Sequence, residues 1–352
     1  MSETVVILGA GVSKTAGAPL MNEFLDVADR LRREFKPSNS DFELVFKGKD
    51  ALQAVHSKAA MDLLNLESVF AAFEMAKLVH SLGQLSVDEI EALPSAMARV
   101  IQQTLEATIK FTFSAGRLYP PAPYTKLVEL VEEVRTKSPA SSNRISFITF
   151  NYDLCLDYAL EYKSFGVDYC LQSPVLPNGV KLLKLHGSLN WSRCPDCGLI
   201  VPLYVRDFLS GGRMFLDSGE KTLVVSSALG RTKHCLSALA SEPFIAPPTW
   251  NKTQYHAQLQ AVWRAAAKEL SDAENIIICG YSLPETDQFF RYLYALGSVG
   301  RSNLKRFWVV NPDEKVRPRF ESLCGPLALT RFQFLPQTVE SAMGEIARVL
   351  RT

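Results

Sequence analysis

Asn151 and His186 are the side chains of this 352-residue sequence whose types and positions best suit chemistry on a bound ligand. Each directly follows an apolar run, Arg144–Phe150 for the asparagine and Val180–Leu185 for the histidine. A neutral histidine, with an ordinary pKa of about 6.5, can accept a proton at physiological pH. An uncharged amide offers both a donor and an acceptor, so it can fix the orientation of a water molecule. Structural roles stay open: a lone histidine is often only a hydrogen-bonding group, and Asn151 or Asp153 would suit the cap of the helix that follows them.

The stretch Thr4–Pro19 has the pattern of a strand, a glycine turn and the start of a helix. Its run Val5–Leu8 is apolar and too short for a helix, so we expect a buried parallel strand. The turn Gly9–Gly11 would let the backbone approach a ligand closely, and a following helix would direct its free N–H groups at a phosphate. The complete G-x-G-x-x-G pattern is absent, because Lys14 occupies the third glycine position. A purely structural tight turn therefore stays open as the alternative.

Cys194 and Cys197 have the C-x2-C spacing of a zinc knuckle. A complete structural zinc site needs further ligands, and the sequence offers only the adjacent His234 and Cys235. We take Cys194, Cys197 and Cys235 as candidate zinc ligands. The alternative is a tight turn with two free thiols.

The elements that must position these side chains alternate along the chain. We expect strands at residues 5–8, 144–150, 180–185, 275–280, 306–310 and 331–335. We expect helices at residues 20–35, 124–136, 154–162 and 255–270, from 285 onward, and at 339–350. This alternation predicts an α/β fold, a Rossmann-like parallel sheet with helices on both faces. Ligands of such sheets bind outside the carboxyl ends of the strands, so we expect convergence there of the turns at Gly9, Asn151, His186, Gly280 and Asn311.

Two parts of the chain depart from this alternation. Residues 41–113 carry apolar residues at helical spacing without a strand signal, which predicts a helical insertion. A stiff connector, the proline-rich stretch 118–123, is predicted to follow this insertion. Residues 191–250 are loop-rich and contain the cysteine pair, which predicts a small module with a degenerate zinc site. We expect both parts to belong to a single catalytic domain spanning residues 1–352.

The composition narrows the class of protein. The 38 Lys and Arg residues nearly balance the 37 Asp and Glu residues, so no overall field favours nucleic acid or a membrane surface. No stretch reaches the roughly 20 apolar residues that span a bilayer. The first residues lack a basic region, so we expect no signal peptide. Seven cysteines without framework spacing fit a reducing compartment, and we therefore expect a cytoplasmic protein.

Six short motifs occur in order along nearly the whole chain. They are GAGVS (9–13), TFNYD (149–153), KLHGSLNW (184–191), FIAPPTWNK (244–252), GYSLPETD (280–287) and VVNPD (309–313). In this order they resemble the sirtuin-like family, and specifically its bacterial branch that hydrolyses NAD rather than deacylating proteins. Asn65-Leu66-Glu67 is similar to an acidic motif in some members. The family often carries a structural zinc module in the region of the cysteines, which implies bound zinc here.

The resemblance implies a role for each matching residue. Asn151 would contact the nicotinamide-side ribose and orient the attacking water, Asp153 would support that pocket, and His186 would act as a base near the ribose hydroxyls. Residues implied to bind the rest of NAD are Gly9, Ala10, Gly11 and Ser13 at the pyrophosphate, Gly280 and Ser282 at phosphate, and Asn311 at the adenine-side ribose. From position alone, Asp287 would complement the dipole of the helix it begins.

The implied activity is NAD+ glycohydrolysis to nicotinamide and ADP-ribose. In the family branch this depletes NAD during antiphage defence, which implies a homo-oligomer or a partner protein of a defence system to restrain it. Protein-deacylating sirtuins follow the first turn with a Pro-Asp-Phe-Arg segment, whereas residues 17–21 here read GAPLM. This departure favours hydrolysis. The alternatives are an NAD-dependent protein deacylase and a non-catalytic sensor of NAD or ADP-ribose.

Overall fold

A parallel sheet forms the centre of the molecule. The computed structural model describes residues 4–34, 39–54, 61–137, 145–171, 179–206, 220–246, 253–284, 287–298 and 304–351. Within these residues, seven strands pair in the order β16–β15–β14–β1–β4–β6–β5, with parallel neighbours throughout. Their bounds are β1 (Thr4–Leu8), β4 (Ile145–Thr149), β5 (Val167–Asp168), β6 (Val180–Lys184), β14 (Asn275–Cys279), β15 (Arg306–Val310) and β16 (Phe332–Leu335). All six predicted strands are present, and the two-residue edge strand β5 is additional.

The inner strands are apolar because both faces of the sheet are covered. Every residue of β1, β4 and β14 is buried, which explains their continuous runs of Val, Ile, Leu and Phe. In the register, Leu8 lies opposite Thr149 on one side and Cys279 on the other. The three strands therefore end at the same level, and the turns that follow them emerge side by side.

The strand order reverses next to β1. The chain begins in the middle of the sheet, adds β4 and β6 on one side, and later adds β14, β15 and β16 on the other. In open α/β sheets the ligand crevice lies at such a reversal, outside the carboxyl ends of the strands. This topology is Rossmann-like, as predicted, and it places the crevice between the turns after β1 and β14.

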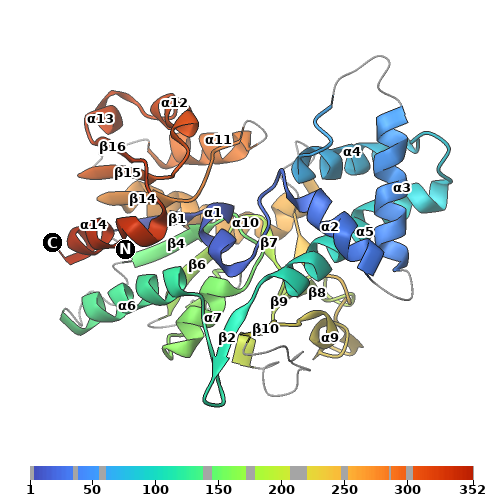
Figure 1. Cartoon of the computed structure of the whole chain (residues 1–352), viewed down its shortest axis with the longest axis horizontal. Helices are drawn as coiled ribbons and strands as arrows, with labels where there is room; N and C mark the ends of the chain where they lie inside the picture. Colours follow the sequence, from blue (N-terminus) through green and yellow to red (C-terminus); the bar gives the residue numbers. More distant parts are fainter. Residues whose placement is uncertain are drawn as a thin grey trace.

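Helices flank the sheet and form a separate group beside it. Their bounds are α1 (Ala10–Ser13), α2 (Phe24–Glu34), α3 (Ser40–Ala54), α4 (Leu66–Val79), α5 (Val87–Thr108), α6 (Ala122–Lys137), α7 (Cys155–Tyr162), α9 (Ser226–Leu229), α10 (Thr253–Asp272), α11 (Gln288–Gly297), α12 (Arg317–Glu321), α13 (Pro326–Leu329) and α14 (Val339–Arg351). The 3-10 turns η1 (Lys14–Ala16) and η3 (Glu314–Val316) add to these. Along the sheet, α6 packs on α7 and α14, and α10 packs on α11. The helices α2 to α5 pack on one another, away from the two chain ends (Figure 1).

The segment after α5 differs from its prediction. Residues 109–113 were expected to continue a helix and 118–123 to form a connector. Instead β2 (Phe111–Ser114) and β3 (Arg117–Tyr119) form an antiparallel hairpin, and β10 (Glu220–Lys221) pairs with β2. The two turn residues, Ala115 and Gly116, both have positive φ, as a tight hairpin turn requires. The helical prediction was wrong here because the apolar residues at 111 and 113 alternate with a period of two.

The described residues of this region, 191–206 and 220–246, form short strands, turns and the four-residue helix α9, as predicted for a loop-rich module. The antiparallel pairs are β7 (Gly187–Ser188) with β13 (Phe244–Ile245), β8 (Trp191–Arg193) with β9 (Ile200–Pro202), and β11 (Lys233–His234) with β12 (Ser237–Ala238). Residues 247–252 of the FIAPPTWNK motif, which include the end of the predicted module, lie outside the described ranges. Residues 285–286 of the GYSLPETD motif lie outside them as well.

No helix among the described residues is both long and apolar enough to cross a membrane.

Candidate functional site

The glycines at the strand ends let two turns approach each other closely. The N–H of Gly11 donates to the carbonyl of Gly280 at 2.9 Å, which joins the turns after β1 and β14. A Cβ placed at Gly9 would lie 2.5 Å from the Tyr281 Cα, and one at Gly280 would lie 2.7 Å from the Val12 nitrogen. The Gly280 backbone also has a φ of 60°, which L side chains rarely adopt. These glycines therefore have a packing role, whatever ligand the turn receives.

The helix behind the glycine turn is shorter than expected. Helix α1 covers only Ala10–Ser13 and passes into η1, and the longer helix α2 begins at Phe24. A helix follows the glycine turn, as predicted, but it has only four residues, and the helix predicted at residues 20–35 is the separate helix α2. Ala10 is half-buried and Gly11 is exposed, so backbone at this turn remains accessible.

Asn151, Ser13 and Asp153 meet in one hydrogen-bonded cluster between the ends of β1 and β4. The Asn151 Nδ2 donates to the Gly9 carbonyl and to the Ser13 Oγ, both at 3.0 Å. The Ser13 hydroxyl donates to the Asp153 Oδ2 at 2.6 Å. Its oxygen also lies 2.6 Å from the Tyr124 hydroxyl oxygen. Three sequence-predicted residues are thus brought into direct contact.

Asn151 and Asp153 differ in whether they hydrogen-bond to the start of the helix that follows them, α7. Helix α7 receives no side-chain cap at its N-cap position, and the Asn151 amide is directed at Gly9 and Ser13 instead. Asp153 does both jobs: its Oδ1 accepts from the Cys155 N–H at 2.9 Å, while its Oδ2 accepts from Ser13. Burial, followed by the Asp153 charge, raises the pKa of Tyr124 well above its ordinary value, so the phenol keeps its proton.

A buried ion pair supports this cluster from behind. The Lys184 ammonium donates to the Asp153 carbonyl at 2.5 Å and to the Asp157 Oδ2 at 3.0 Å. The other oxygen of Asp157 accepts from the Tyr169 hydroxyl at 2.6 Å, and Asn190 donates to that hydroxyl at 3.0 Å. Both charged side chains are only 1% exposed. Their hydrogen bonds satisfy charges that would otherwise be costly to bury.

His186 lies deep at the end of β6. Its side chain is 2% exposed, and its Nε2 lies 3.9 Å from the Asp287 Oδ2. The Phe150 ring meets the imidazole edge-on, with the ring centres 5.2 Å apart. The carbonyl of His186 accepts from the Ala246 N–H at 2.8 Å, which ties the strand end to β13.

The remaining predicted ligand residues lie at the ends of β14 and β15. The Asn311 Nδ2 donates to the Tyr281 carbonyl at 3.1 Å, and its Oδ1 accepts from the Asp313 N–H. Asn311 is buried, so its side chain fixes the neighbouring turn. Ser282 is exposed, and its carbonyl accepts from the Arg319 guanidinium at 3.2 Å. Asn311 is thus joined to the turn after β14.

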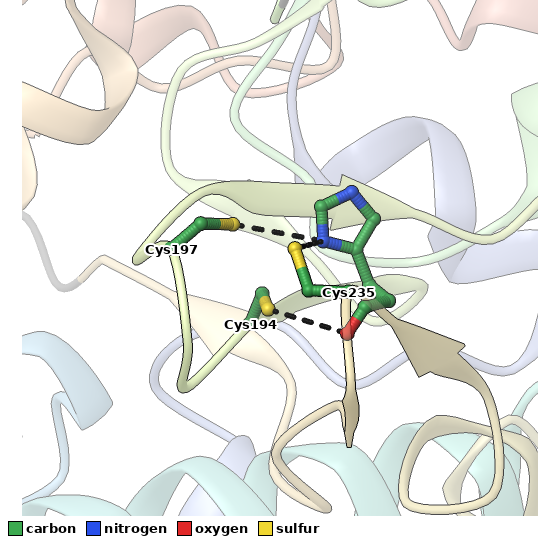
Figure 2. Close-up of side chains that lie close together, drawn as sticks. Cys194, Cys197 and Cys235 are labelled. Carbon is green, nitrogen blue, oxygen red and sulfur yellow. Dashed lines mark hydrogen bonds between the residues drawn. The ribbon is translucent and has the colours of Figure 1, made fainter.

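The cysteines form a second site, with a histidine as its fourth member. The ligand atoms of Cys194, Cys197, His234 and Cys235 all lie within 4.8 Å of one another. The His234 Nδ1 is 3.6 Å from the Cys197 Sγ and 3.4 Å from the Cys235 Sγ (Figure 2). The adjacent pair can converge because Cys235 has a φ of 53°, in the left-handed region, at the turn between β11 and β12.

This cluster fits a structural zinc ion. Three thiolates and one imidazole are a standard donor set, and tetrahedral coordination separates sulfur ligands by roughly 3.8 Å. Hydrogen bonds from Cys197 and Asp196 backbone and from the His234 side chain outweigh desolvation and lower the pKa of Cys194 to about 7. Asp196 accepts from the Leu236 and Ser237 N–H groups at 3.0 and 2.9 Å, which joins the knuckle to the hairpin. Bound zinc would crosslink these two segments and supply no reaction step.

Several residues of the two sites were not among the predicted site residues. They are Tyr124, Lys184, Tyr281, Asp287 and His234. Lys184 and Tyr281 stand within matched motifs, directly beside predicted residues, so motif membership could have indicated them. Asp287 is the N-cap residue of α11, where a carboxylate suits the helix dipole, but its side chain makes no capping hydrogen bond and accepts from the Tyr281 hydroxyl instead.

A cavity of about 490 Å³ lies between the helices α4 and α5 and the strand β13. Phe70, Pro94 and Ala98 line its helical side, and Phe244 and Ile245 line the opposite side. Since β13 pairs with the Gly187–Ser188 strand, the cavity is one strand away from the segment that follows His186.

Comparison with known proteins gives fold-level likenesses only. No protein-family model and no curated protein matches the sequence. Among solved structures, a Sir2 homologue in complex with NAD is 16% identical with a TM-score of 0.45, covering 99% of this chain and 89% of that chain. Sir2Tm bound to a propionylated peptide is 14% identical with a TM-score of 0.43, covering 98% and 92%. Both scores lie below 0.5, so the proposal below rests on the residues of the site.

Proposed function

We propose that this protein is an NAD+ glycohydrolase that cleaves NAD+ to nicotinamide and ADP-ribose. The observation that carries the proposal is the contact of Asn151 with both Ser13 and Gly9, at the carboxyl ends of neighbouring strands. It joins an amide that can orient water to the turn suited to a pyrophosphate, at the position where α/β sheets bind ligands. The motif resemblance supports the same substrate.

The binding mode follows from the turns around the crevice. The pyrophosphate would lie over the backbone of Gly9, Ala10 and Gly11, where the absence of side chains at the glycines lets it come close. The turn containing Gly280 and Ser282 would contact phosphate from the other side. Asn311 would hold the adenine-side ribose, by a backbone or side-chain contact beyond those it makes to its own turn.

Hydrolysis needs little covalent chemistry from the protein. The bond from ribose C1′ to the nicotinamide nitrogen breaks, and its electron pair stays on that nitrogen and neutralises the pyridinium. Water oxygen bonds to C1′ and loses one proton, which His186 takes and returns to solvent. Asn151 orients the water beside a sugar that becomes cationic, and an uncharged amide suits this task. Asp153 supports Asn151 through Ser13.

Ser13 is not required as a nucleophile in this scheme. Its hydroxyl proton is donated to Asp153, and its oxygen accepts from Asn151. These contacts hold the serine as a structural centre of the cluster. A covalent ribosyl intermediate on Ser13 is therefore not part of the proposal.

Such an activity fits a bacterial antiphage effector that depletes NAD in an infected cell. An enzyme of this kind must be restrained until infection. Homo-oligomerisation, or a defence-system partner protein, would supply the restraint, and the helices α3 to α5 are the candidate contact region.

Product analysis of the purified protein with NAD+ tests the activity. The proposal predicts stoichiometric nicotinamide and ADP-ribose without any acyl substrate. Oligomeric and monomeric fractions are assayed separately. If both fractions bind NAD+ without turnover, hydrolysis is contradicted and a non-catalytic sensor of NAD or ADP-ribose is supported.

The cavity beside β13 favours one second candidate, a protein deacylase. Its position between α5 and β13 would suit an acyl-lysine side chain reaching toward the segment after His186. This activity predicts nicotinamide release only when an acyl-lysine peptide is present, with an O-acyl-ADP-ribose product. The same assay with and without the peptide separates the two candidates.

A further inference from the structure

Asp287 is a buried carboxylate beside His186 that the proposed reaction does not yet use. Its side chain is 1% exposed. It occupies the N-cap position of α11, but that helix receives no side-chain cap from it. Burying a carboxylate is costly unless hydrogen bonds or an opposite charge compensate. The groups around Asp287 therefore indicate what maintains it there.

Two groups meet the same carboxylate oxygen. The Tyr281 hydroxyl donates to the Asp287 Oδ2 at 2.5 Å, and the His186 Nε2 lies 3.9 Å from this oxygen. Burial, and then the Asp287 charge, raises the pKa of Tyr281 well above its ordinary value. The phenol therefore keeps its proton and remains a donor to the Asp287 carboxyl group.

Tyr281 is itself held in place by packing. Its ring stacks on Phe150, with centres 4.2 Å apart and planes 11° from parallel, and Phe150 meets His186 edge-on. The Tyr281 carbonyl accepts from Asn311. Phe150 directly precedes Asn151 and contacts both His186 and Tyr281, and Tyr281 donates to Asp287. The two aromatic side chains therefore connect Asn151, His186 and Asp287. The relative positions of these groups are fixed by buried contacts.

We propose, building on the proposed NAD+ hydrolysis, that Asp287 is a positioning residue that sets the tautomer and the charge of His186. The carboxylate favours hydrogen on Nε2, the ring nitrogen facing it, and leaves the Nδ1 lone pair to take the proton from water. The resulting imidazolium then has a buried counter-charge. Tyr281 keeps the carboxylate oriented without taking its charge.

Other titratable groups lie around this pair. Glu67 of α4 and Arg291 of α11 act on Tyr281 through their charges, and the Tyr152 ring lies 6.4 Å from the imidazole. Asp287 is a carboxylate at ion-pair distance from His186. An opposite charge at 4–6 Å raises a histidine pKa by roughly one to three units, whereas burial lowers it. Under this proposal, the charge of Asp287 opposes the effect of burial on His186.

Histidine NMR titration of the full-length protein tests this role without turnover. The chain has five histidines, and the His186→Asn spectrum identifies the resonance of His186 by its loss. We expect the pKa of His186 to fall by about one unit or more in Asp287→Asn, and Nδ1 to be the unprotonated nitrogen of the neutral wild-type ring. The control Asp272→Asn removes a carboxylate that pairs with Lys268 on α10 and should leave this pKa unchanged. An unchanged His186 pKa in folded Asp287→Asn, or a neutral ring protonated on Nδ1, would overturn the proposal.

Kinetics separate this role from a structural one. If the wild type hydrolyses NAD+, Asp287→Asn should lower kcat about tenfold or more and move the acid limb of the kcat profile to lower pH, by the shift seen in the titration. Asp287→Glu should restore part of both. A loss of stability with an unmoved acid limb would contradict the proposal. If the wild type does not turn over NAD+, hydrolysis fails as the function, and the NMR titration still decides the role of Asp287.

Discussion

Several polar side chains in the core are held in place by hydrogen bonds to residues that are distant in the sequence. Ser13 and Asp153 are separated by 140 residues, and Lys184 reaches back to Asp157. Such contacts cannot be inferred from local patterns, because the sequence does not state which turn faces which. Asn151 and His186 could be predicted, since each follows a buried apolar run. The groups that orient them could not.

Removing the charge of Lys184 tests the value of the buried pair. We expect Lys184→Met to lower the free energy of unfolding by about 3–5 kcal/mol, because Asp157 would be left as an uncompensated buried charge. The matched control is Lys305→Met, whose exposed pair with Glu274 should contribute under about 1 kcal/mol. Urea unfolding followed by circular dichroism measures both. Equal effects of the two substitutions would refute the assignment.

At the scale of elements, the turns after β1 and β14 act as one unit. The register ends both strands at the same level, and the carbonyl of Gly280 accepts from the Gly11 N–H. The predicted strands were correct because strands buried on both faces leave continuous apolar runs in the sequence. The hairpin of β2 and β3 was missed because its short alternation was attributed to the preceding helix.

A methyl group at Gly9 should separate these two turns. Gly9→Ala would place its Cβ 2.5 Å from the Tyr281 backbone, so we expect a loss of roughly 1–3 kcal/mol in stability and a weakened NAD+ affinity. The control Gly344→Ala lies in α14 with nothing within 4 Å, and should stabilise the protein by about 0.5–1 kcal/mol. Thermal unfolding and calorimetric titration with NAD+ report the two effects. A fully stable Gly9→Ala with unchanged binding would show that the turns tolerate separation.

Glu106 joins α5 to the start of α9 and should make that contact depend on pH. It accepts from the Val225 and Ser226 N–H groups, yet burial outweighs these bonds and raises its pKa above the ordinary value of 4.5. A raised pKa in the folded state stabilises the fold below pH 4.5 and loses that contribution as the pH rises through the raised value. The stability of the wild type relative to Glu106→Gln should therefore fall as the pH increases from 4.5. Urea unfolding over a pH series gives this difference, and a constant difference would contradict the expected shift.

The whole molecule consists of a central sheet with the candidate site at its strand ends, a group of helices and a loop-rich region with the cysteine cluster. The hydrogen-bonded cluster of Asn151, Ser13 and Asp153 lies at the ends of β1 and β4. The helices α2 to α5 form a group away from the two chain ends (Figure 1). The cysteine cluster brings together two segments of the loop-rich region. The Rossmann-like architecture was predictable, since strands and helices alternate along the chain. The complete metal-binding set was not, because two adjacent ligands converge only through the left-handed backbone at Cys235.

Metal content tests whether that set works as a structural centre. We expect about one zinc per chain in the purified protein, and its loss in Cys197→Ser together with a lower Tm. Cys170→Ser, the same substitution away from the cluster, should keep both the metal and the Tm. Elemental analysis and thermal unfolding, with and without a chelator, measure these quantities. A Tm that is indifferent to the chelator in a zinc-loaded sample would contradict a structural role.

The proposed cleavage of NAD+ by Asn151 and His186 is tested most directly by the rate of nicotinamide release in matched variants. Wild type, Asn151→Ala, His186→Asn and the control His80→Asn would be compared at equal NAD+ saturation, after circular dichroism has shown each to be folded. We predict release by the wild type and the control, and a fall of kcat by about 10²- to 10⁴-fold in His186→Asn, as loss of a general base gives, with a comparable fall in Asn151→Ala. If folded Asn151→Ala and His186→Asn release nicotinamide at the wild-type rate, other residues perform the cleavage and the proposed roles of Asn151 and His186 are contradicted.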